Sequence, residues 1–482
     1  MRRTLGQMQT DIHETSSSEQ GITLGASIRV SVSRDYDVIV IGAGPGGEVC
    51  AGKLGDGGKR VAIVENERVG GECAFWACIP SKALLRSEQP YMESRRVPGS
   101  KAGVAGSLSF SQAGAWRTES VDNYDDAGHL PWLREHHIDL IRGEAKVEQP
   151  GVVRVKDRSY TCDTIVLATG SEPAIPEIEG LAGGRFWTSR EATSAKSVPQ
   201  RLAVLGSGAV GVELGQVFAR YGSKVTLVEP GRHVLPREEP VIADIMLEAL
   251  HEDGIDVVLG KKATSVRFGD GGVTVSLDGN QNVEADELLV ATGRKARLNA
   301  INFDSLGIAI EKHSIKVDAH CRAAENIYAV GDVTGVALFT HLAKYQGWIA
   351  ATNILGKPEQ ARYDAVPRAV FTDPEIGSVG LTEAQAAERS VEFVVAEVDL
   401  TSAPRSNLFY EKPVNGRVKF VVDKNAQTII GASVIGPCAA EMIGWATVAI
   451  KSGMRVAALR HVINSFPTFS EAFFYALEAV KL

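Results

Sequence analysis

Two cysteines close together carry the clearest chemical signal in the chain. Cys73 and Cys78 are separated by four residues, two of them aromatic, in the segment Gly70-Gly71-Glu72-Cys73-Ala74-Phe75-Trp76-Ala77-Cys78-Ile79-Pro80-Ser81-Lys82. Cysteines at this spacing can close a short, reducible disulfide, and a positive neighbour lowers a thiol's pKa and makes it reactive. A buried cysteine pair or half of a metal site is the alternative, but the sequence has no second Cys/His pair at zinc spacing. We therefore predict a redox-active disulfide and no metal site.

A glycine-rich turn about thirty residues before the cysteines shows which element positions them. Residues 36–41 are a mainly apolar run that predicts a buried parallel strand, followed by Gly-Ala-Gly-Pro-Gly-Gly at 42–47 and a helix. A second predicted strand, residues 61–64, ends at Glu65. This order of strand, glycine turn, helix, strand and acid is the pattern of a dinucleotide-binding unit.

Each glycine in this pattern has a physical role. Gly42 permits the tight turn, Gly44 lets the backbone approach a pyrophosphate, and Gly47 lets the helix pack closely on the strand. The free N–H groups at the start of the helix then face the phosphates. Glu65 is expected to accept hydrogen bonds from a ribose.

The same pattern occurs a second time. The strand at 202–205 leads into a glycine turn, the strand at 225–228 ends in an acid, and the first glycine and the acid are 23 residues apart in both units. The second unit contains Gly206, Gly208, Gly211 and Glu229. Two such units predict two bound nucleotides, with electrons passing from one to the other.

Length and composition limit the class of protein. A chain of 482 residues predicts about three domains or more, and a net charge of −8 with few cysteines argues against nucleic acid, an anionic membrane surface or a secreted disulfide scaffold. No apolar run is long enough to span a bilayer. We expect a cytoplasmic protein, with residues 1–34 either a flexible extension or the result of a start codon placed too early.

The segment from Cys73 to Lys82 resembles the redox-active segment of the class I pyridine nucleotide–disulfide oxidoreductases. These are flavoproteins such as dihydrolipoamide dehydrogenase, glutathione reductase and mercuric reductase, and the resemblance extends from Asp35 to Leu482 in the family's motif order. It implies an α/β fold with two Rossmann-like nucleotide-binding domains, for FAD and NAD, and an α+β C-terminal dimerisation domain. The spacer Ala74-Phe75-Trp76-Ala77 departs from the commoner Asn- and Gly-containing spacer.

The resemblance also implies domain boundaries. The interval from 95 to 120 is rich in glycine and serine and predicts a loop within the first domain. The expected segments are 1–34 (extension), 35–172 (FAD domain with the disulfide), 173–292 (NAD(P) domain), 293–362 (return to the flavin) and 363–482 (dimerisation).

The two nucleotides are assigned by the same resemblance. The first unit is expected to bind FAD and the second NAD(P)H, with NADH favoured because the Glu229 carboxylate would repel a 2′-phosphate, although Arg232 could weaken that preference. Further expected cofactor positions are Thr169, Gly170, Gly293, Gly331, Asp332 and His341.

The implied chemistry is a relay of electrons. NADH would deliver hydride to the flavin, the reduced flavin would open the disulfide at Cys78, and Cys73 would attack the acceptor. Lys82 matches the family lysine beside the flavin, and Glu213 matches its ion-pair partner.

One position breaks the family pattern. The family's disulfide reductases use a histidine followed by proline, with a glutamate five residues after the histidine, supplied by the other subunit. Here the proline and Glu471 are present, but Phe466 stands at the histidine position. Phenylalanine cannot carry a proton, and loss of a general acid–base typically costs about 10²–10⁴-fold in rate. His461 and His341 are possible substitutes.

Four aromatic residues suggest what the acceptor is. Phe466 and Phe469, with Phe75 and Trp76 beside the disulfide, predict a flat or apolar acceptor, unless they pack a dimer interface. The chain has no cysteine after Cys438, which argues against a specialised mercury reductase.

We therefore predict a homodimeric FAD-dependent NAD(P)H oxidoreductase that reduces a small-molecule acceptor, either an unusual disulfide or a quinone-like molecule. The alternatives are a true dihydrolipoamide dehydrogenase and, outside the enzymes, a redox-sensing or partner-binding flavoprotein.

Overall fold

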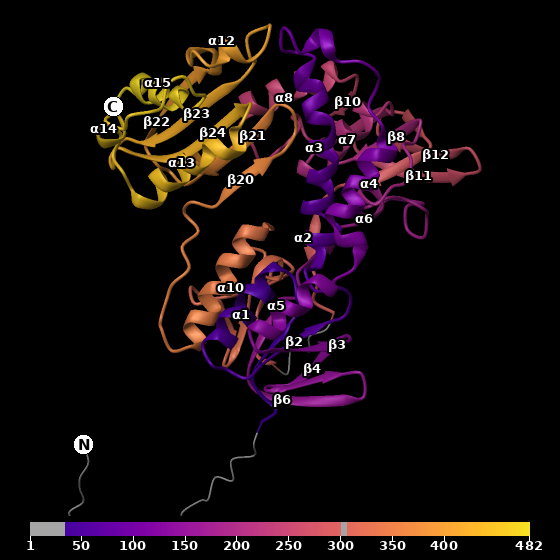
Figure 1. Cartoon of the computed structure of the whole chain (residues 1–482), viewed down its shortest axis with the longest axis vertical. Helices are drawn as coiled ribbons and strands as arrows, with labels where there is room; N and C mark the ends of the chain where they lie inside the picture. Colours follow the sequence, from indigo (N-terminus) through magenta and orange to yellow (C-terminus); the bar gives the residue numbers. More distant parts are fainter. Residues whose placement is uncertain (1–33, 300–305) are drawn as a thin grey trace, which may run out of the picture.

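The computed structural model describes residues 34–299 and 306–482, so nearly all of the expected N-terminal extension lies outside the described residues. Figure 1 shows three bodies: one that contains α1 and β6, one that contains α7 and β12, and a C-terminal one that contains α13 and α15. The first two are the nucleotide-binding units expected from the repeat.

The first body is built on a mainly parallel sheet of order β18-β19-β6-β1-β2-β3. Its central strand is almost entirely apolar and buried, and helices α1 and α10 pack on each other beside it. Its elements are β1 (Tyr36–Ile41), α1 (Pro45–Asp56), β2 (Val61–Glu65), α5 (Leu130–Glu135), β3 (Ile138–Arg142), β4 (Ala145–Gln149), β5 (Val152–Val155), β6 (Arg158–Leu167), β16 (Ile310–Glu311), β17 (Ser314–Ile315), β18 (Arg322–Ala324), β19 (Ile327–Ala329) and α10 (Thr340–Ile354).

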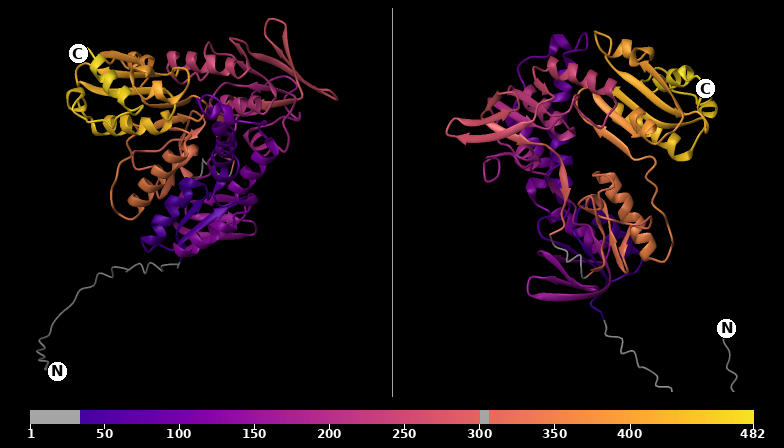
Figure 2. Two further views of the ribbon diagram at one scale, coloured as in Figure 1. Left: turned by 45° about the horizontal axis from the view of Figure 1, so that its top comes forward. Right: turned by 180° about the vertical axis from the view of Figure 1, so that it is seen from behind.

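The second body repeats this design with the parallel order β10-β9-β8-β14. An antiparallel sheet, β11-β12-β13, projects from it away from the C-terminal body (Figure 2). Its elements are α6 (Ser189–Thr193), β8 (Arg201–Leu205), α7 (Ala209–Arg220), β9 (Lys224–Glu229), α8 (Pro240–Glu252), β10 (Asp256–Leu259), β11 (Ala263–Gly269), β12 (Gly272–Leu277), β13 (Gln281–Ala285) and β14 (Glu287–Val290).

The chain crosses between the two bodies in both directions at one place. The outgoing strand β7 (Ser171–Pro173) pairs antiparallel with the returning strand β15 (Arg294–Ala296). This pairing brings both crossings next to the redox segment.

The redox segment continues into a long helix that links the bodies. α2 (Gly71–Phe75) contains the first cysteine, and α3 (Cys78–Ser94) begins at the second and packs against α7. The loop predicted for 95–120 is wrong in its second part, because α4 (Phe110–Ser120) forms there and packs on α3. Ser109 caps α4 by accepting a hydrogen bond from the Gln112 N–H, so a serine that suggested a loop in fact starts a helix.

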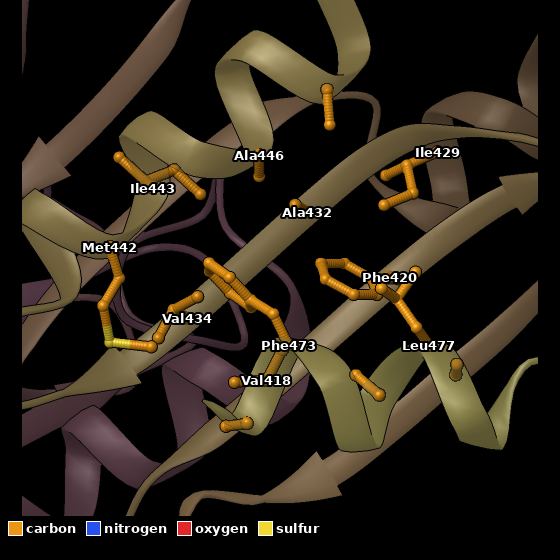
Figure 3. Close-up of a cluster of buried hydrophobic side chains, with 14 of the residues drawn as sticks. Val418, Phe420, Ile429, Ala432, Val434, Met442, Ile443, Ala446, Phe473 and Leu477 are labelled. Atoms are coloured by element: carbon orange, nitrogen blue, oxygen red, sulfur yellow. The ribbon is translucent and has the colours of Figure 1, made fainter. Parts of the chain in front are cut away.

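The C-terminal body is an antiparallel sheet of order β20-β21-β24-β23-β22. Side chains of two helices and the sheet form one core around Phe420 and Phe473 (Figure 3). Its elements are β20 (Pro367–Val370), β21 (Glu375–Gly380), α11 (Glu383–Glu388), β22 (Phe393–Asp399), α12 (Ser406–Phe409), β23 (Arg417–Asp423), β24 (Thr428–Gly436), α13 (Ala439–Ser452), α14 (Val456–Leu459) and α15 (Glu471–Ala479).

The predicted fold class is confirmed: two Rossmann-like units and an α+β C-terminal domain. Within the described residues, every helix is too short or too polar to cross a lipid bilayer.

Candidate redox site

A cavity of about 820 Å³ lies where the first nucleotide unit, the redox segment and α7 meet. It joins residues that are up to 330 positions apart in the sequence, from Ile41 to Phe371. The residues expected at the site that line it are Gly42, Gly44, Glu65, Cys73, Cys78, Lys82, Thr169, Gly170, Glu213, Gly331, Asp332 and His341.

The glycine turns of the two units have the same geometry. Gly42 and Gly206 have φ values of +103° and +99°, which glycine adopts without strain. A Cβ at Gly47 would lie 2.0 Å from the Gly42 carbonyl oxygen, and one at Gly211 would lie 1.9 Å from the Gly206 oxygen. Both helices therefore pack so closely on their turns that any side chain at these positions would clash.

The middle glycine of each turn faces open space. No atom lies within 4 Å of where a Cβ of Gly44 or Gly208 would be. At Gly44 this space is the cavity, and the N-terminus of α1 opens onto it without a side-chain cap. A pyrophosphate fits this position, because the free N–H groups and the helix dipole stabilise negative charge there.

The acids at the ends of the second strands are held alike. Glu65 accepts a hydrogen bond from the Ala43 N–H at 2.8 Å, and Glu229 accepts one from the Ser207 N–H at 3.0 Å. Burial raises the pKa of Glu65. Each carboxylate is thus fixed beside its glycine turn, where a nucleotide ribose would lie. Gly206, Gly208, Gly211 and Glu229 lie on the second unit, outside the cavity lining.

The two cysteines meet at the base of the cavity as free thiols. The Thr340 hydroxyl donates a hydrogen bond to the Cys73 sulfur at 3.1 Å and lies 3.4 Å from the Cys78 sulfur. Thr340 is the first residue of α10, and sequence reasoning gave it no role of its own. The signal in the sequence was its place at the start of the run Thr340-His341-Leu342-Ala343, where members of the resembled family contact the flavin.

The environment makes the two thiols unequal. The hydrogen bond with Cys73 lowers the pKa of Cys78, and the Thr340 hydroxyl and the Lys82 ammonium lower it further, against the effect of burial. The same hydrogen bond and burial raise the pKa of Cys73. The surroundings of the pair therefore favour the thiolate form at Cys78 and the thiol form at Cys73.

Lys82 stands one helical turn after Cys78 on α3. Its Nζ is 2.7 Å from the Glu213 carboxylate of α7, and Glu213 also accepts a hydrogen bond from the Phe371 N–H at 2.9 Å. Glu213 is almost completely buried. Glu213 thus joins the redox helix, the second nucleotide unit and the connection between β20 and β21 of the C-terminal sheet.

Glu72, next to Cys73, anchors a cluster that sequence reasoning missed. Its carboxylate accepts hydrogen bonds from Arg190, at 3.0 Å from Nε, and from Arg297, at 2.7 Å. The Arg190 guanidinium lies over the Trp76 ring, with its central carbon 5.1 Å from the ring centre. These partners come from the second unit and the return crossing, so no local pattern in the sequence could have identified them.

Asp332 precedes α10 in the chain, and His341 is the second residue of that helix. Asp332 accepts a hydrogen bond from the Ser171 hydroxyl at 2.6 Å, and burial raises its pKa. The Nε2 of His341 lies 2.9 Å from the Pro367 carbonyl oxygen, and its ring stacks on Phe339. Burial lowers the pKa of His341, which favours a neutral ring whose Nε2–H donates to that carbonyl.

The C-terminal residues expected at the site are not part of the cavity lining of this chain. Phe466 is 73% exposed, and Glu471 accepts a hydrogen bond from the Thr468 N–H at 3.1 Å. From the sequence we expected Phe466 and Phe469 at the mouth of the site and Phe75 and Trp76 beside the disulfide. Phe75 is buried at 1% exposure, and Phe469 is buried at 5%, where it packs against the Phe409 ring, so neither ring is free to contact an acceptor. Trp76 alone of the four lines the cavity.

These features fit FAD. The cavity is open at Gly44 for a pyrophosphate and carries a buried carboxylate at Glu65 and a half-buried one at Asp332 for hydroxyl groups. Cys78 and Lys82 also line it, and a thiol with a lowered pKa beside an ammonium suits a redox-active ring.

Comparison with known proteins extends this result. The family model described as pyridine nucleotide-disulphide oxidoreductase matches residues 36–354, and that of its dimerisation domain matches 366–477. Mercuric reductase of Staphylococcus aureus is 33% identical over 91% of this chain and 81% of its own length, and dihydrolipoyl dehydrogenase of Geobacillus stearothermophilus is 32% identical over 93% and 96%. The solved structure of the HOCl-induced flavoprotein disulfide reductase RclA of Escherichia coli matches with a TM-score of 0.82 at 29% identity, over 92% of this chain and all of RclA.

Proposed function

Because the chain belongs to the pyridine nucleotide-disulphide oxidoreductase family, we propose that it passes electrons from NADH to a quinone-like acceptor and exchanges only slowly with small disulfides. The protein is an enzyme that uses FAD and NAD(P)H, as its family does. Bound FAD supplies a group that takes two electrons from the nicotinamide and passes them on. The choice of acceptor is then decided by the side chains around it.

The roles proposed for the residues follow from their positions. The turn at Gly42, with Gly44, Glu65 and Asp332, holds FAD. Cys78 carries the thiolate beside the ring, and Lys82, held by Glu213, stabilises that negative charge. Cys73 is the sulfur that exchanges with a disulfide.

Phe466 is the observation on which the choice of acceptor rests. It occupies the place of the family's proton-carrying histidine, and its side chain is exposed and apolar. Exchange with a disulfide needs a group that takes the proton from Cys73, whose pKa is raised. Reduction of a quinone by bound FAD would not require deprotonation of Cys73, so the absence of the histidine would not slow it.

We also propose that the active form is a homodimer. The C-terminal region matches the family's dimerisation domain, and Ile463 and Phe466 are 97% and 73% exposed in the single chain. Two large apolar side chains so close together gain most by being covered by another subunit. Light scattering at micromolar concentration should therefore give twice the chain mass, and a monomer would contradict this proposal.

NADH is the proposed donor rather than NADPH. The Glu229 carboxylate, at the end of β9, places a negative charge where a 2′-phosphate would lie. The ratio of kcat/KM for NADH to that for NADPH should be well above one, and Glu229→Ala should reduce it.

The test of the acceptor is a steady-state panel of lipoamide, glutathione disulfide, naphthoquinones, Hg²⁺, Cu²⁺ and oxygen. The wild type should be fast with naphthoquinones and slow with disulfides. Phe466→His should raise disulfide turnover by about tenfold or more, because Glu471 is five residues away to orient the imidazole, and quinone turnover should hardly change. Ile463→His is the matched control, since it adds a histidine on the same exposed segment at the wrong place.

Other outcomes identify the alternatives. If the wild type turned over lipoamide at rates normal for dihydrolipoyl dehydrogenases, the slow disulfide exchange predicted from Phe466 would be contradicted. Stoichiometric reduction without turnover, with a change in affinity for a partner, would indicate a redox sensor. Cys73→Ser should end disulfide turnover and spare quinone turnover.

A further inference from the structure

The Thr340 hydroxyl lies between the two sulfurs of the reduced pair. It donates to Cys73 at 3.1 Å and is 3.4 Å from Cys78, a contact in which either atom can be the donor. Across residues 34–299 and 306–482, no other side-chain oxygen or nitrogen hydrogen bonds to either sulfur. Of the charged and titratable groups nearby, Lys82 is bound to Glu213, His341 faces the Pro367 carbonyl, and Lys344 acts on Cys73 through its positive charge.

The reduced pair holds a single proton, and the Thr340 hydroxyl contacts both of the sulfurs that could carry it. Reduction of a disulfide by the equivalent of one hydride, two electrons and one proton, breaks the S–S bond and leaves one thiol and one thiolate. A hydroxyl can donate one hydrogen bond and accept two, and it rotates to suit its partners. It can therefore connect a thiol on one side with a thiolate on the other.

We propose that Thr340 is a catalytic residue that relays this proton between the two cysteines. The S–H bond of Cys73 breaks and its proton passes to the Thr340 oxygen, while the hydroxyl's own proton passes to the Cys78 thiolate. Cys73 becomes the thiolate, Cys78 becomes the thiol, and Thr340 is again a hydroxyl that now donates to Cys73. No group changes its oxidation state, and no further reactant is needed.

The arrangement of donors fits both ends of this transfer. The hydrogen bond from Thr340 to Cys73 is the one needed after the transfer, when Cys73 carries the charge. The contact with Cys78 permits either direction, as it must if Thr340 donates before the transfer and accepts after it.

The relay gives this chain a way to form a nucleophile without the family's histidine. The neighbouring Cys78 and burial raise the pKa of Cys73, so the interchange sulfur becomes a better nucleophile when its proton is moved away. The Thr340 hydroxyl lowers the pKa of both thiols. The inference rests on the roles proposed for Cys73 and Cys78 and is independent of the acceptor. It accounts for whatever slow disulfide exchange the wild type retains.

The experiment uses the full-length, FAD-loaded protein reduced by one equivalent of NADH. Alkylation of Cys73 by iodoacetamide is followed by peptide mass spectrometry across pH, together with the long-wavelength absorbance due to the Cys78 thiolate beside the flavin. Thr340→Val removes the hydroxyl at nearly constant volume, and Thr340→Ser retains it. Thr352→Val is the matched control, because that hydroxyl, on the same helix, bonds to the Trp348 carbonyl instead.

Thr340→Val should slow the alkylation of Cys73 near neutral pH by about tenfold or more, since it removes a hydrogen bond to a charged sulfur. It should also shift the pH profile of the thiolate absorbance upward. Thr340→Ser should restore both, and Thr352→Val should change neither. The proposal would be overturned if Cys73 were alkylated in Thr340→Val at the wild-type rate. It would also be overturned if Thr340→Ser did not restore the wild-type rate.

If the valine variant does not retain FAD, Thr340→Ala and Thr340→Ser are compared in its place, with the same expected difference. Alkylation involves no electron acceptor, so its outcome is separate from that of the acceptor panel. If Phe466→His did not raise disulfide turnover, the proposal of a quinone-like acceptor would be contradicted. The alkylation result for Thr340 would not be affected.

Discussion

At the scale of single residues, the two sulfurs are chemically different although they belong to one pair. Cys78 starts a helix and has the Lys82 ammonium in reach, whereas Cys73 lies on α2 and is the more strongly protonated of the two. This asymmetry predicts which sulfur contacts the flavin as a thiolate and which one exchanges.

The asymmetry can be checked with two serine variants. Cys73→Ser leaves Cys78 permanently unpaired, so its oxidised form should show the long-wavelength thiolate band without any reductant. Cys78→Ser should not show this band in either state. Absorbance spectra during anaerobic titration measure both, with Cys438→Ser as the control at a cysteine outside the cavity. Identical spectra for the two variants would contradict the assigned roles.

The pH dependence of the band tests the role of Lys82. Because the folded protein lowers the pKa of Cys78, the thiolate is kept at neutral pH and is lost only as pH falls through that lowered pKa. Lys82→Met removes a favourable positive charge and should move the midpoint of the band to higher pH. A midpoint that stays in place in the variant would show that the ammonium does not act on Cys78.

At the scale of elements, the two strand–turn–helix units are built alike and are expected to hold different nucleotides. Their first glycines share a left-handed φ, and their third glycines lie against the carbonyl of the first. Replacing the third glycine with alanine should therefore cause the same steric clash in both units. The loss of function should differ, because the two units are expected to bind different nucleotides.

Gly47→Ala places a Cβ against the Gly42 carbonyl and should lower the FAD content of the purified protein by at least about half. Gly211→Ala makes the equivalent clash in the second unit. It should leave FAD bound but raise the KM for NADH several-fold. Flavin absorbance per chain and NADH kinetics measure the two losses. Gly444→Ala in α13, where a Cβ meets nothing within 4 Å, should change neither. The assignment of the nucleotides fails if Gly211→Ala, and not Gly47→Ala, loses the flavin.

At the scale of the whole molecule, one buried arginine ties three parts of the chain together. Arg220, on α7, is 3% exposed and pairs with Glu88 of α3 at 2.7 Å, and with Asp253 and Asp373 at 3.0 Å each. Asp373 lies between β20 and β21 of the C-terminal sheet. The ion pairs thus lie on the same two helices as Lys82 and Glu213 and hold the C-terminal domain against them.

Arg220→Met should be strongly destabilising, by about 3–5 kcal/mol, because it leaves buried carboxylates without their partner. Thermal unfolding should show a clear fall in Tm, and adding Glu88→Gln should recover part of it by removing one of the stranded charges. Arg60→Met is the matched control: its pair with Asp37 is on the surface and should be worth about 1 kcal/mol or less. Equal effects of the two methionine variants would show that the buried cluster does not hold the domains.

The sequence alone determined the features that depend on neighbours in the chain. The glycine turns, the acids at the strand ends, and Cys73 with Cys78 and Lys82 all follow from short spacings, because strand, turn and helix geometry fix such positions locally. The order of these motifs was enough to predict the α/β fold with its C-terminal domain, and Phe466 was visible as a departure from the pattern.

Only the tertiary structure decided which distant side chains meet. Thr340 reaches both sulfurs across more than 260 residues, and the arginines around Glu72 come from α6 and the return crossing. Aromatic side chains that look alike in the sequence differ in burial: Phe75 and Phe469 fill cores, while Phe466 is exposed. Burial and long-range contacts depend on how whole elements pack, and no local spacing in a chain encodes that packing.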